Sequence, residues 1–330
     1  MTSTKNISSE RKTIAVLGAQ LTRAWGSEFM AGVLDSARAQ DVNVVYFVGG
    51  KPVAIAAPAH EGRSYGLYDL IKPGKFDGLI LSADMGHGPT AEDIKNFCLA
   101  FAPTPIVSFS VPAEGVTSIL ADNEGGMRAV IRHLIEVHGH KRIAFLRGAK
   151  GQLEADQRFN AYKEELKAHD IRFDEHLVVE GDYSPESGRA AIRTLLDERG
   201  IQVQAIAASN DRMAFGALEM LQQRGIRVPD TIALTGFDNV SDAESMGVPL
   251  TTVHQSFYEA GRLTFDALLK RMNGEEMGDL HLLPSDLVVR WSCGCLPESI
   301  KRAVVLPKEV AHTARLENKR DAVIRALFGA

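Results

Sequence analysis

Three polar side chains stand where apolar runs of the sequence end, and their types suit hydrogen bonding to a small molecule. Asn210 and Asp211 follow one apolar run, and Asp238 follows the next. An amide offers both a donor and an acceptor and a carboxylate accepts, so the set suits a ligand rich in hydroxyl or amine groups. Simpler roles stay open, because an Asp before a helix often caps it and an Asp before Asn239 often forms a turn.

One basic and several aromatic side chains fit the same chemistry. Arg158 stands at the start of a predicted helix, where its guanidinium could fork onto hydroxyls or a carboxylate. As an isolated surface residue it would contribute little. Flat rings beside polar groups grip a sugar or a planar base, although a single ring is often part of the core. The rings near predicted strand ends are Trp25, Phe109, Tyr183 and Phe237, of which Phe237 has the core as its alternative.

The histidines and cysteines do not complete a metal site in any one stretch. His133, His138 and His140 lie close in sequence, but Gly139 ends the predicted helix between the last two and no fourth ligand is near. We therefore predict no metal.

The cysteines form at most half of a thiolate site. Cys293 and Cys295 are two residues apart and Cys98 is far away in sequence, so reduced structural thiols are favoured.

Catalytic and nucleotide-binding motifs are missing from the sequence. It has no G-x-x-x-x-G-K-S/T loop, no G-x-G-x-x-G after the first predicted strand, no nucleophile elbow and no H-E-x-x-H. An enzyme would need a base with a partner, and Asp211 or Asp238 could serve only as half of such a pair. We predict no catalytic residue and no cofactor.

The elements that must position these residues alternate between apolar runs and amphipathic segments. The first series has predicted strands at 13–17, 42–48, 76–81 and 105–109, with helices around 29–37, 65–71 and 91–101. A short strand at 119–122 opens a second series, with helices at 126–137, 157–168, 185–199 and 211–224 and strands at 143–146, 177–179 and on both sides of the last helix. Late segments are a strand at 250–253, a helix at 258–272 and a strand at 282–290. This alternation predicts parallel strands joined by right-handed crossovers.

We therefore predict an α/β protein with two Rossmann-like lobes, parallel sheets, several hinge strands and a cleft between the lobes. The predicted parts are a disordered leader at 1–11, an N-terminal lobe of 12–121 plus about 254–283, a C-terminal lobe of 122–253 plus about 284–295, and a C-terminal connector helix at 296–330. In that last segment Leu316, Val323 and Leu327 follow a coiled-coil-like spacing, and an amphipathic helix packed on the body is the alternative.

Composition narrows the class of protein. A chain of 330 residues suits two lobes of ordinary size, and a net charge of −5 argues against a nucleic-acid partner. The N-terminus lacks the apolar run of a secretory signal and no segment is long enough to span a bilayer, so we predict a cytoplasmic protein with no membrane partner. A signal peptide trimmed from the chain would leave the same sequence.

Four strings of the sequence resemble the effector-binding domain of the lactose and purine repressor (LacI) family. They are residues 208–217, 227–230, 236–239 and 249–253, in the order and spacing of the family. The resemblance covers roughly 12–295. It implies a periplasmic-binding-protein-like fold of type I, with three hinge crossovers and a small molecule held between the lobes.

The resemblance also ranks the candidate residues. Its ligand-binding positions correspond here to Arg158, Asn210 and Asp238 as polar contacts, Tyr183 as a stacking ring, and Gln255, Phe109 and Ser110 as further cleft positions. Trp25 stays a candidate as an aromatic in polar surroundings. Many members of the family have an acidic residue where this chain has Ser110, which points away from their well-known sugars.

Two departures from the family shape the predicted function. Only about a dozen residues precede the first predicted strand, where the repressors have a helix-turn-helix, so we expect no direct DNA binding by this chain. The ending Ser292 to Cys295 resembles that of sensor domains that precede diguanylate cyclases, histidine kinases or AraC-type regulators. The resemblance therefore implies a sugar- or polyol-sensing domain, a homodimer, that signals to an output module C-terminal to this segment. The alternative is a secreted solute-binding protein of a sugar transporter, which an export signal would reveal.

Overall fold

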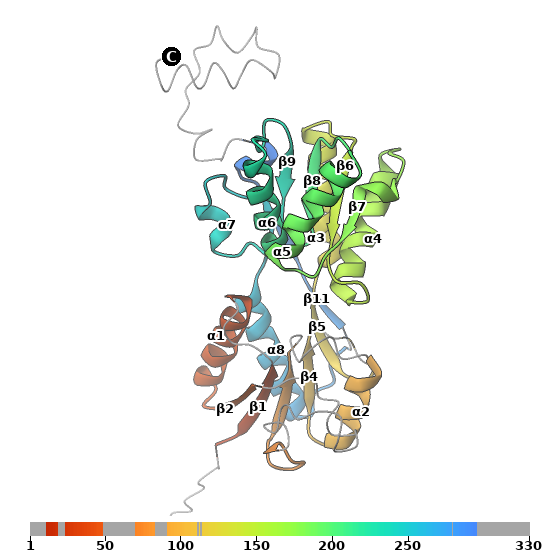
Figure 1. The fold of residues 1–330 in the computed structure, drawn as a ribbon. Helices are drawn as coiled ribbons and strands as arrows, with labels where there is room; N and C mark the ends of the chain where they lie inside the picture. The colour runs from red at the N-terminus through yellow and green to blue at the C-terminus, as the bar shows by residue number, and fades with distance from the viewer. Residues whose placement is uncertain are drawn as a thin grey trace, which may run out of the picture.

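The computed structural model describes residues 11–18, 24–48, 70–82, 91–110, 112, 114–278 and 280–295. These residues form two lobes, one above the other, each with a parallel sheet flanked by helices (Figure 1). This is the α/β architecture that the alternation of strands and helices predicts. The predicted leader up to residue 10, most of the predicted helix at 65–71, and the tail from 296 lie outside the described residues.

The N-terminal lobe has a six-stranded sheet in the order β11-β5-β4-β3-β1-β2. Its strands are β1 (Thr13–Gly18), β2 (Asn43–Val48), β3 (Gly78–Leu81), β4 (Ile106–Phe109), β5 (Thr117–Ala121) and β11 (Leu280–Leu283). All neighbouring strands are parallel. The short central strands β3 and β4 are buried along their whole length, as expected when helices cover both faces of a sheet. The helices of this lobe are α1 (Ala24–Ala39), α2 (Ala91–Phe101) and α8 (Phe257–Met272).

The C-terminal lobe has a four-stranded parallel sheet in the order β7-β6-β8-β9. Its strands are β6 (Ile143–Arg147), β7 (Val178–Glu180), β8 (Ala205–Ala208) and β9 (Ala233–Thr235). Its helices are α3 (Asn123–Arg132), α4 (Leu153–Ala168), α5 (Pro185–Ile192), α6 (Asp211–Gln223) and α7 (Asp242–Ser245). Two of them continue as π-helical turns, α3 into His133–Val137 and α5 into Arg193–Glu198.

The late segments of the chain return to both lobes. Strand β10 (Thr252–Gln255) pairs antiparallel with β12 (Ser285–Val288), and isolated bridges join Thr235 to Thr251 and Asp238 to His254 beside the C-terminal sheet. Strand β11 instead pairs with β5 in the other lobe. The chain therefore passes between the lobes after β5, after β10 and after β11.

The prediction of a single strand at 282–290 is wrong. Two strands, β11 and β12, occupy this stretch and belong to different sheets. They meet at Pro284, which has no backbone N–H to continue a ladder.

A close contact between helices fixes α8 in the N-terminal lobe. A Cβ added at Gly32 of α1 would lie 2.0 Å from the carbonyl oxygen of Tyr258, and one at Gly261 of α8 would lie 2.0 Å from that of Phe29. The two helix backbones approach so closely that only glycine fits at these crossings. A late helix is thus bound to an early one, and the N-terminal lobe is built from both ends of the chain.

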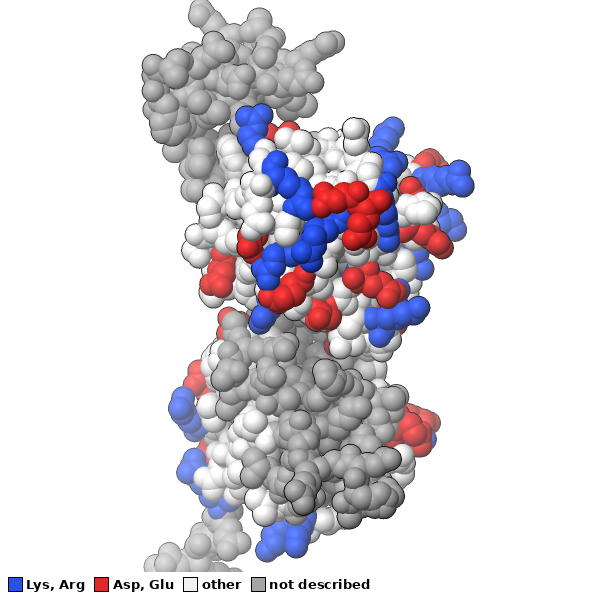
Figure 2. All heavy atoms as spheres, viewed as in Figure 1, with Lys and Arg blue, Asp and Glu red and all other residues white. Residues whose placement is uncertain are grey.

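In the part of the chain that the structure describes, no helix has the length and apolar character needed to cross a membrane. On the face shown in Figure 2, the Lys and Arg side chains of the described residues are interspersed with Asp and Glu.

Candidate functional site

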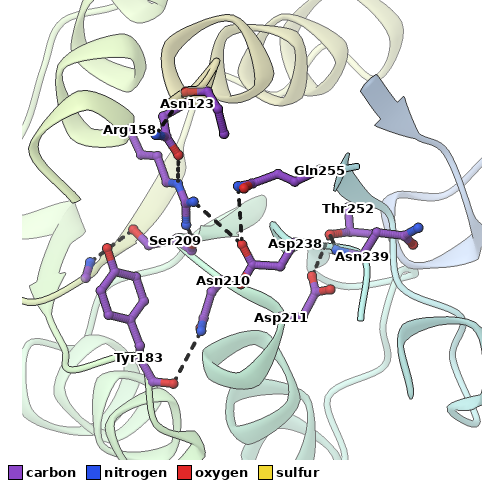
Figure 3. A network of polar contacts seen from close by, with 12 residues as sticks. Asn123, Arg158, Tyr183, Ser209, Asn210, Asp211, Asp238, Asn239, Thr252 and Gln255 are labelled. Atoms are coloured by element: carbon purple, nitrogen blue, oxygen red, sulfur yellow. Dashed lines mark hydrogen bonds and ion pairs between the residues drawn. The ribbon is translucent and has the colours of Figure 1, made fainter. Parts of the chain in front are cut away.

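Arg158 is the centre of a polar network at the carboxyl ends of the C-terminal strands (Figure 3). Arg158 lies in the second turn of α4, which follows β6, and it is 5% exposed. Its Nε donates to Asn123 Oδ1 at 2.9 Å and its Nη1 donates to the carbonyl oxygen of Ser209 at 2.6 Å. Its Nη2 lies 3.6 Å from Asp238 Oδ1. The guanidinium is thus held in one orientation, with a carboxylate within reach.

Asp238 follows β9 and joins the network from the other side. Its side chain is 24% exposed, and its Oδ1 also accepts from Gln255 Nε2 at 3.5 Å. Its backbone N–H donates to the carbonyl oxygen of Val253 at 2.9 Å, which ties the loop to β10. Burial raises the pKa of Asp238 to about 6, against the opposing effect of the Arg158 charge.

Three of the predicted site residues have the left-handed backbone conformation. The φ angles are +67° at Ser110, +67° at Tyr183 and +105° at Asp238, each at a turn after a strand. Residues with a Cβ rarely adopt such angles, and the cost is of order 1–3 kcal/mol each. Their concentration at the strand ends is typical of a functional site.

Asn210, rather than Asp211, caps helix α6. Its Oδ1 accepts from the backbone N–H of Met213 at 2.9 Å, and its Nδ2 donates to the carbonyl oxygen of Tyr183 at 3.3 Å. The interpretation of Asp211 as the cap is therefore wrong, since Asp211 is the first helical residue. Capping thus uses the side-chain oxygen of Asn210. The side-chain nitrogen of Asn210 holds the turn at Tyr183.

Asp211 is completely buried beneath the site. Its Oδ1 accepts from Thr252 Oγ1 at 2.5 Å and its Oδ2 accepts from the backbone N–H of Val240 at 2.9 Å. These bonds connect α6 to β10 and to the loop after β9. Burial, and then the nearby charge of Asp238, raise the pKa of Asp211 to about 8.

Tyr183 packs against the loop after β6. A Cβ added at Gly148 would lie 2.3 Å from Tyr183 Cζ, so the ring fills the space that this glycine leaves. The Tyr183 hydroxyl is buried and has no hydrogen-bond partner in the described part of the chain. A buried hydroxyl normally has a partner, so this unpaired group is unusual.

Two hollows lie beside the network where the lobes meet. One is lined by residues that include Ser110 of the N-terminal lobe and Asn123 and Gln157 of the C-terminal lobe. The other has Phe109 and Gln255 in its wall. Residues of both lobes therefore border the first hollow.

The aromatic residues of the N-terminal lobe lie deeper. Phe109 is 1% exposed and stacks on Phe29 with ring centroids 4.7 Å apart, and it also lines the second hollow. Trp25 packs on Phe257 at 5.9 Å, and Phe257 is itself part of the wall of that hollow. Phe237 belongs to the core of the C-terminal lobe.

One residue of the network, Asn123, is absent from the set predicted from the sequence. It is the first residue of α3 and is 5% exposed; its Oδ1 accepts from Arg158, and its Nδ2 donates to Gln157 Oε1 at 3.0 Å. It follows the strand predicted at 119–122, so the polar-after-strand pattern that selected Asn210 could have selected it too.

A second cluster of side chains lies elsewhere in the C-terminal lobe. The ligand atoms of His133, His138, Cys293 and Cys295 all lie within 4.8 Å of one another. The prediction that the histidines have no further ligands near them is therefore wrong. The third histidine, His140, instead stacks on His138 with ring centroids 5.7 Å apart. Hydrogen bonds with Cys295, and further ones with the two histidines, lower the pKa of Cys293 despite its burial.

Comparison with known proteins gives the fold and the site a context. A family described as "Periplasmic binding protein-like domain" matches residues 131–293. The transcriptional regulator CelR of Thermobifida fusca is 39% identical over 183 residues, which are 55% of this chain and 53% of CelR. The transcriptional repressor CytR of Escherichia coli K12 is 28% identical over 291 residues, 87% of this chain and 81% of CytR. The chain is thus similar over most of its length to regulators of the LacI type.

Solved structures extend this similarity to the fold over most of the chain. The Lac repressor dimer bound to operator and an anti-inducer has a TM-score of 0.73 and 26% identity, covering 86% of this chain and 95% of the other. The complex of CelR with cellobiose has a TM-score of 0.72 and 29% identity, covering 86% and 85%. The alignment with the CelR sequence spans only about half of that regulator. The chain thus has the two-lobed fold that the resemblance implies.

Proposed function

We propose that this LacI-type domain is a cytoplasmic sensor that binds a sugar or polyol between its lobes. The observation that carries the proposal is the network around Arg158, in which Asn123, Asp238 and Gln255 converge from α3, the loop after β9 and the end of β10. It presents a fixed guanidinium beside a carboxylate and two amides. Vicinal hydroxyls both donate and accept, so they complement such a set.

The relatives support the choice of ligand class. They are transcriptional regulators, and one of them, CelR, has a solved structure in complex with cellobiose. We propose that Arg158, Asp238 and Gln255 contact the ligand directly, and that Asn210 acts by holding the turn at Tyr183. Trp25, Phe109 and Ser110 would complete the cleft from the N-terminal lobe.

The chain crosses between the lobes three times, and such crossings can act as a hinge. A ligand held by both lobes binds the closed arrangement more tightly than the open one, so it shifts the population toward closure. We propose that a homodimer passes this closure to an output module C-terminal to the described residues, without turnover of the ligand. Support for that direction of output comes from the resemblance of the ending at Cys293 and Cys295 to other sensor domains.

Calorimetry against a panel of mono- and disaccharides, polyols and nucleosides tests the ligand class. Cellobiose is the first probe, because of the CelR complex. Asp238→Asn should weaken the binding of any hit at least about tenfold, since it removes the charge facing Arg158. Asp197→Asn, which removes a surface carboxylate paired with Arg224, is the matched control. A panel without a binder, or equal affinity of Asp238→Asn and wild type, would contradict the proposed site.

A scattering measurement tests the closure. The radius of gyration of the full chain should decrease when a sugar from the panel is added, and it should not change for Asp238→Asn at the same concentration. A hit that binds without any change of dimension would contradict the proposed closure while leaving the binding site intact.

A further inference from the structure

We propose that His133, His138, Cys293 and Cys295 bind one zinc ion in a closed, structural site. The four residues supply two imidazole nitrogens and two thiol sulfurs. This donor set is typical of structural zinc, which takes four protein ligands in a tetrahedron and leaves no position for substrate. The site lies at the end of the α3 helix that is remote from Asn123, so it is separate from the sugar cleft.

Four of the six distances between the ligand atoms are known, and these fit a tetrahedron around one ion. Zn–N bonds of about 2.05 Å and Zn–S bonds of about 2.3 Å place two nitrogens about 3.3 Å apart, and a nitrogen and a sulfur about 3.6 Å apart. The two Nε2 atoms are 3.3 Å apart. Cys293 Sγ lies 3.4 Å from His133 Nε2, and Cys295 Sγ lies 3.6 Å from His133 Nε2 and 3.4 Å from His138 Nε2.

Hydrogen bonds alone account poorly for this arrangement. The Nε2 atom of His133 lies within 3.6 Å of three partners: His138 Nε2, Cys293 Sγ and Cys295 Sγ. An imidazole nitrogen has either one hydrogen or one lone pair, so it can serve one of them well. A cation at the centre serves all four atoms at once, and this explains why each points inward.

The backbone on the helix side is specialised for this geometry. In an α-helix, residues five positions apart point about 140° away from each other. The π-helical turn His133–Val137 closes over five residues, and it brings His138 back to the side of His133. Such turns occur frequently at functional sites. Gly139, with φ +69°, then turns the chain away.

The cysteine side is specialised as well. Cys293 ends a short 3-10 helix, and Gly294 follows with φ +102°, an angle that residues with a Cβ rarely adopt. This turn brings Cys293 and Cys295 to the same side. A Cβ at Gly294 would also lie 3.4 Å from the His138 ring, so the turn packs directly on that ligand.

The position of the site indicates its role. It joins the segment Trp291–Cys293 to the end of α3, and Cys295 is the last of the described residues. Without the ion, that segment is held by single hydrogen bonds such as Ser292 Oγ to the carbonyl oxygen of Leu234. The zinc would therefore fasten the last described segment to the end of α3.

Metal analysis of the tag-free full chain, purified under reducing conditions, tests the proposal. We expect about one equivalent of zinc per chain, and a tetrahedral cobalt spectrum with sulfur-to-metal charge transfer after exchange. Cys295→Ser and His138→Gln should lower zinc affinity at least a hundredfold and abolish the charge-transfer band. Both residues are half-buried, so these variants are less disruptive than a change at the buried Cys293.

Two control variants keep the outcome clear. His140→Gln changes the neighbouring histidine outside the quartet and Cys98→Ser changes the third cysteine, and both should retain wild-type zinc content. A chelator should lower the melting temperature of the wild type and of both controls, but not that of Cys295→Ser. Wild-type protein that holds neither zinc nor cobalt, a Cys293–Cys295 disulfide in its place, or full zinc content in Cys295→Ser would overturn the proposal.

Discussion

The guanidinium of Arg158 lies over the ring of Phe237, with Cζ 3.8 Å from the ring centroid, and the residue after that ring is Asp238. A cation–π contact and a charge pair therefore come from two consecutive residues and hold the same side chain. Arg158 is placed before any ligand arrives. Such preorganisation lowers the entropic cost of binding.

Replacing Arg158 should destabilise the domain as well as the site. Arg158→Ala leaves Asn123 Oδ1 and the carbonyl oxygen of Ser209 without their donor inside the protein. We expect the free energy of unfolding to fall by about 2–4 kcal/mol. Urea denaturation measures it, and Arg189→Ala, which removes surface ion pairs, should cost about 1 kcal/mol or less. Equal losses in the two variants would contradict the central role of Arg158.

The buried carboxyl of Asp211 should make stability depend on pH. Its pKa is raised to about 8 in the folded state and is near 3.8 in the unfolded chain, so the folded state holds the extra proton between these values. The free energy of unfolding should therefore decrease as pH rises from about 4 to about 8. Denaturation of Asp211→Asn across this range should show a shallower decrease. Parallel curves for the wild type and the variant would refute the assignment.

Ligand affinity should depend on the ionisation of Asp238. The pKa of its carboxyl is raised to about 6, and a carboxylate accepts hydrogen bonds that the protonated form cannot. For a sugar found by the panel, we expect constant affinity above about pH 7 and a decline as pH falls through about 6. Calorimetry with Asp238→Asn should give weak binding without this decline. A wild-type affinity that is flat down to about pH 5 would exclude a direct contact with the carboxylate.

A close contact between α5 and α6 should not tolerate a methyl group. A Cβ at Gly216 would lie 1.9 Å from the carbonyl oxygen of Pro185, a backbone atom that cannot move aside alone. Gly216→Ala should lower the free energy of unfolding by about 1–3 kcal/mol. Gly247→Ala, where nothing lies within 4 Å, should change it by no more than about 0.5 kcal/mol. Thermal or urea unfolding of these two variants measures both changes in the free energy of unfolding.

Local periodicity predicts most of the fold. The helix predicted at 211–224 and the strands on either side of it agree with α6, β8 and β9 to within a residue or two at the helix ends. Parallel strands are buried on both faces, so they appear as short continuous apolar runs that are easy to recognise. The alternation of such runs with helical spacing then indicates the layered architecture.

What the sequence could not predict depends on partners that are distant along the chain. The apolar pattern continues across Pro284, and only the pairing of β11 with β5 shows that the chain changes lobe there. The N-cap of α6 is Asn210 and not Asp211, the residue whose position before the predicted helix suggested a cap. Asn and Asp cap equally well, and the choice of Asn210 depends on the burial of Asp211 under Thr252.

The histidine and cysteine cluster shows the same limit. His133 and Cys293 are 160 residues apart, and no local pattern connects them. The two halves, a histidine pair five residues apart and a Cys-Gly-Cys turn, are each visible in the sequence. Only the fold could bring them together.

The pairing of α8 with α1 and of β11 with β5 also has a consequence for synthesis. The sheet β7-β6-β8-β9 is complete once residue 235 has left the ribosome, whereas the N-terminal lobe lacks α8 and β11 until residue 283 has emerged. The N-terminal lobe, whose synthesis begins first, is therefore completed after the C-terminal sheet. Its open sheet edge at β5 waits while the whole of the C-terminal sheet is made, a period in which a nascent chain is exposed to mispairing.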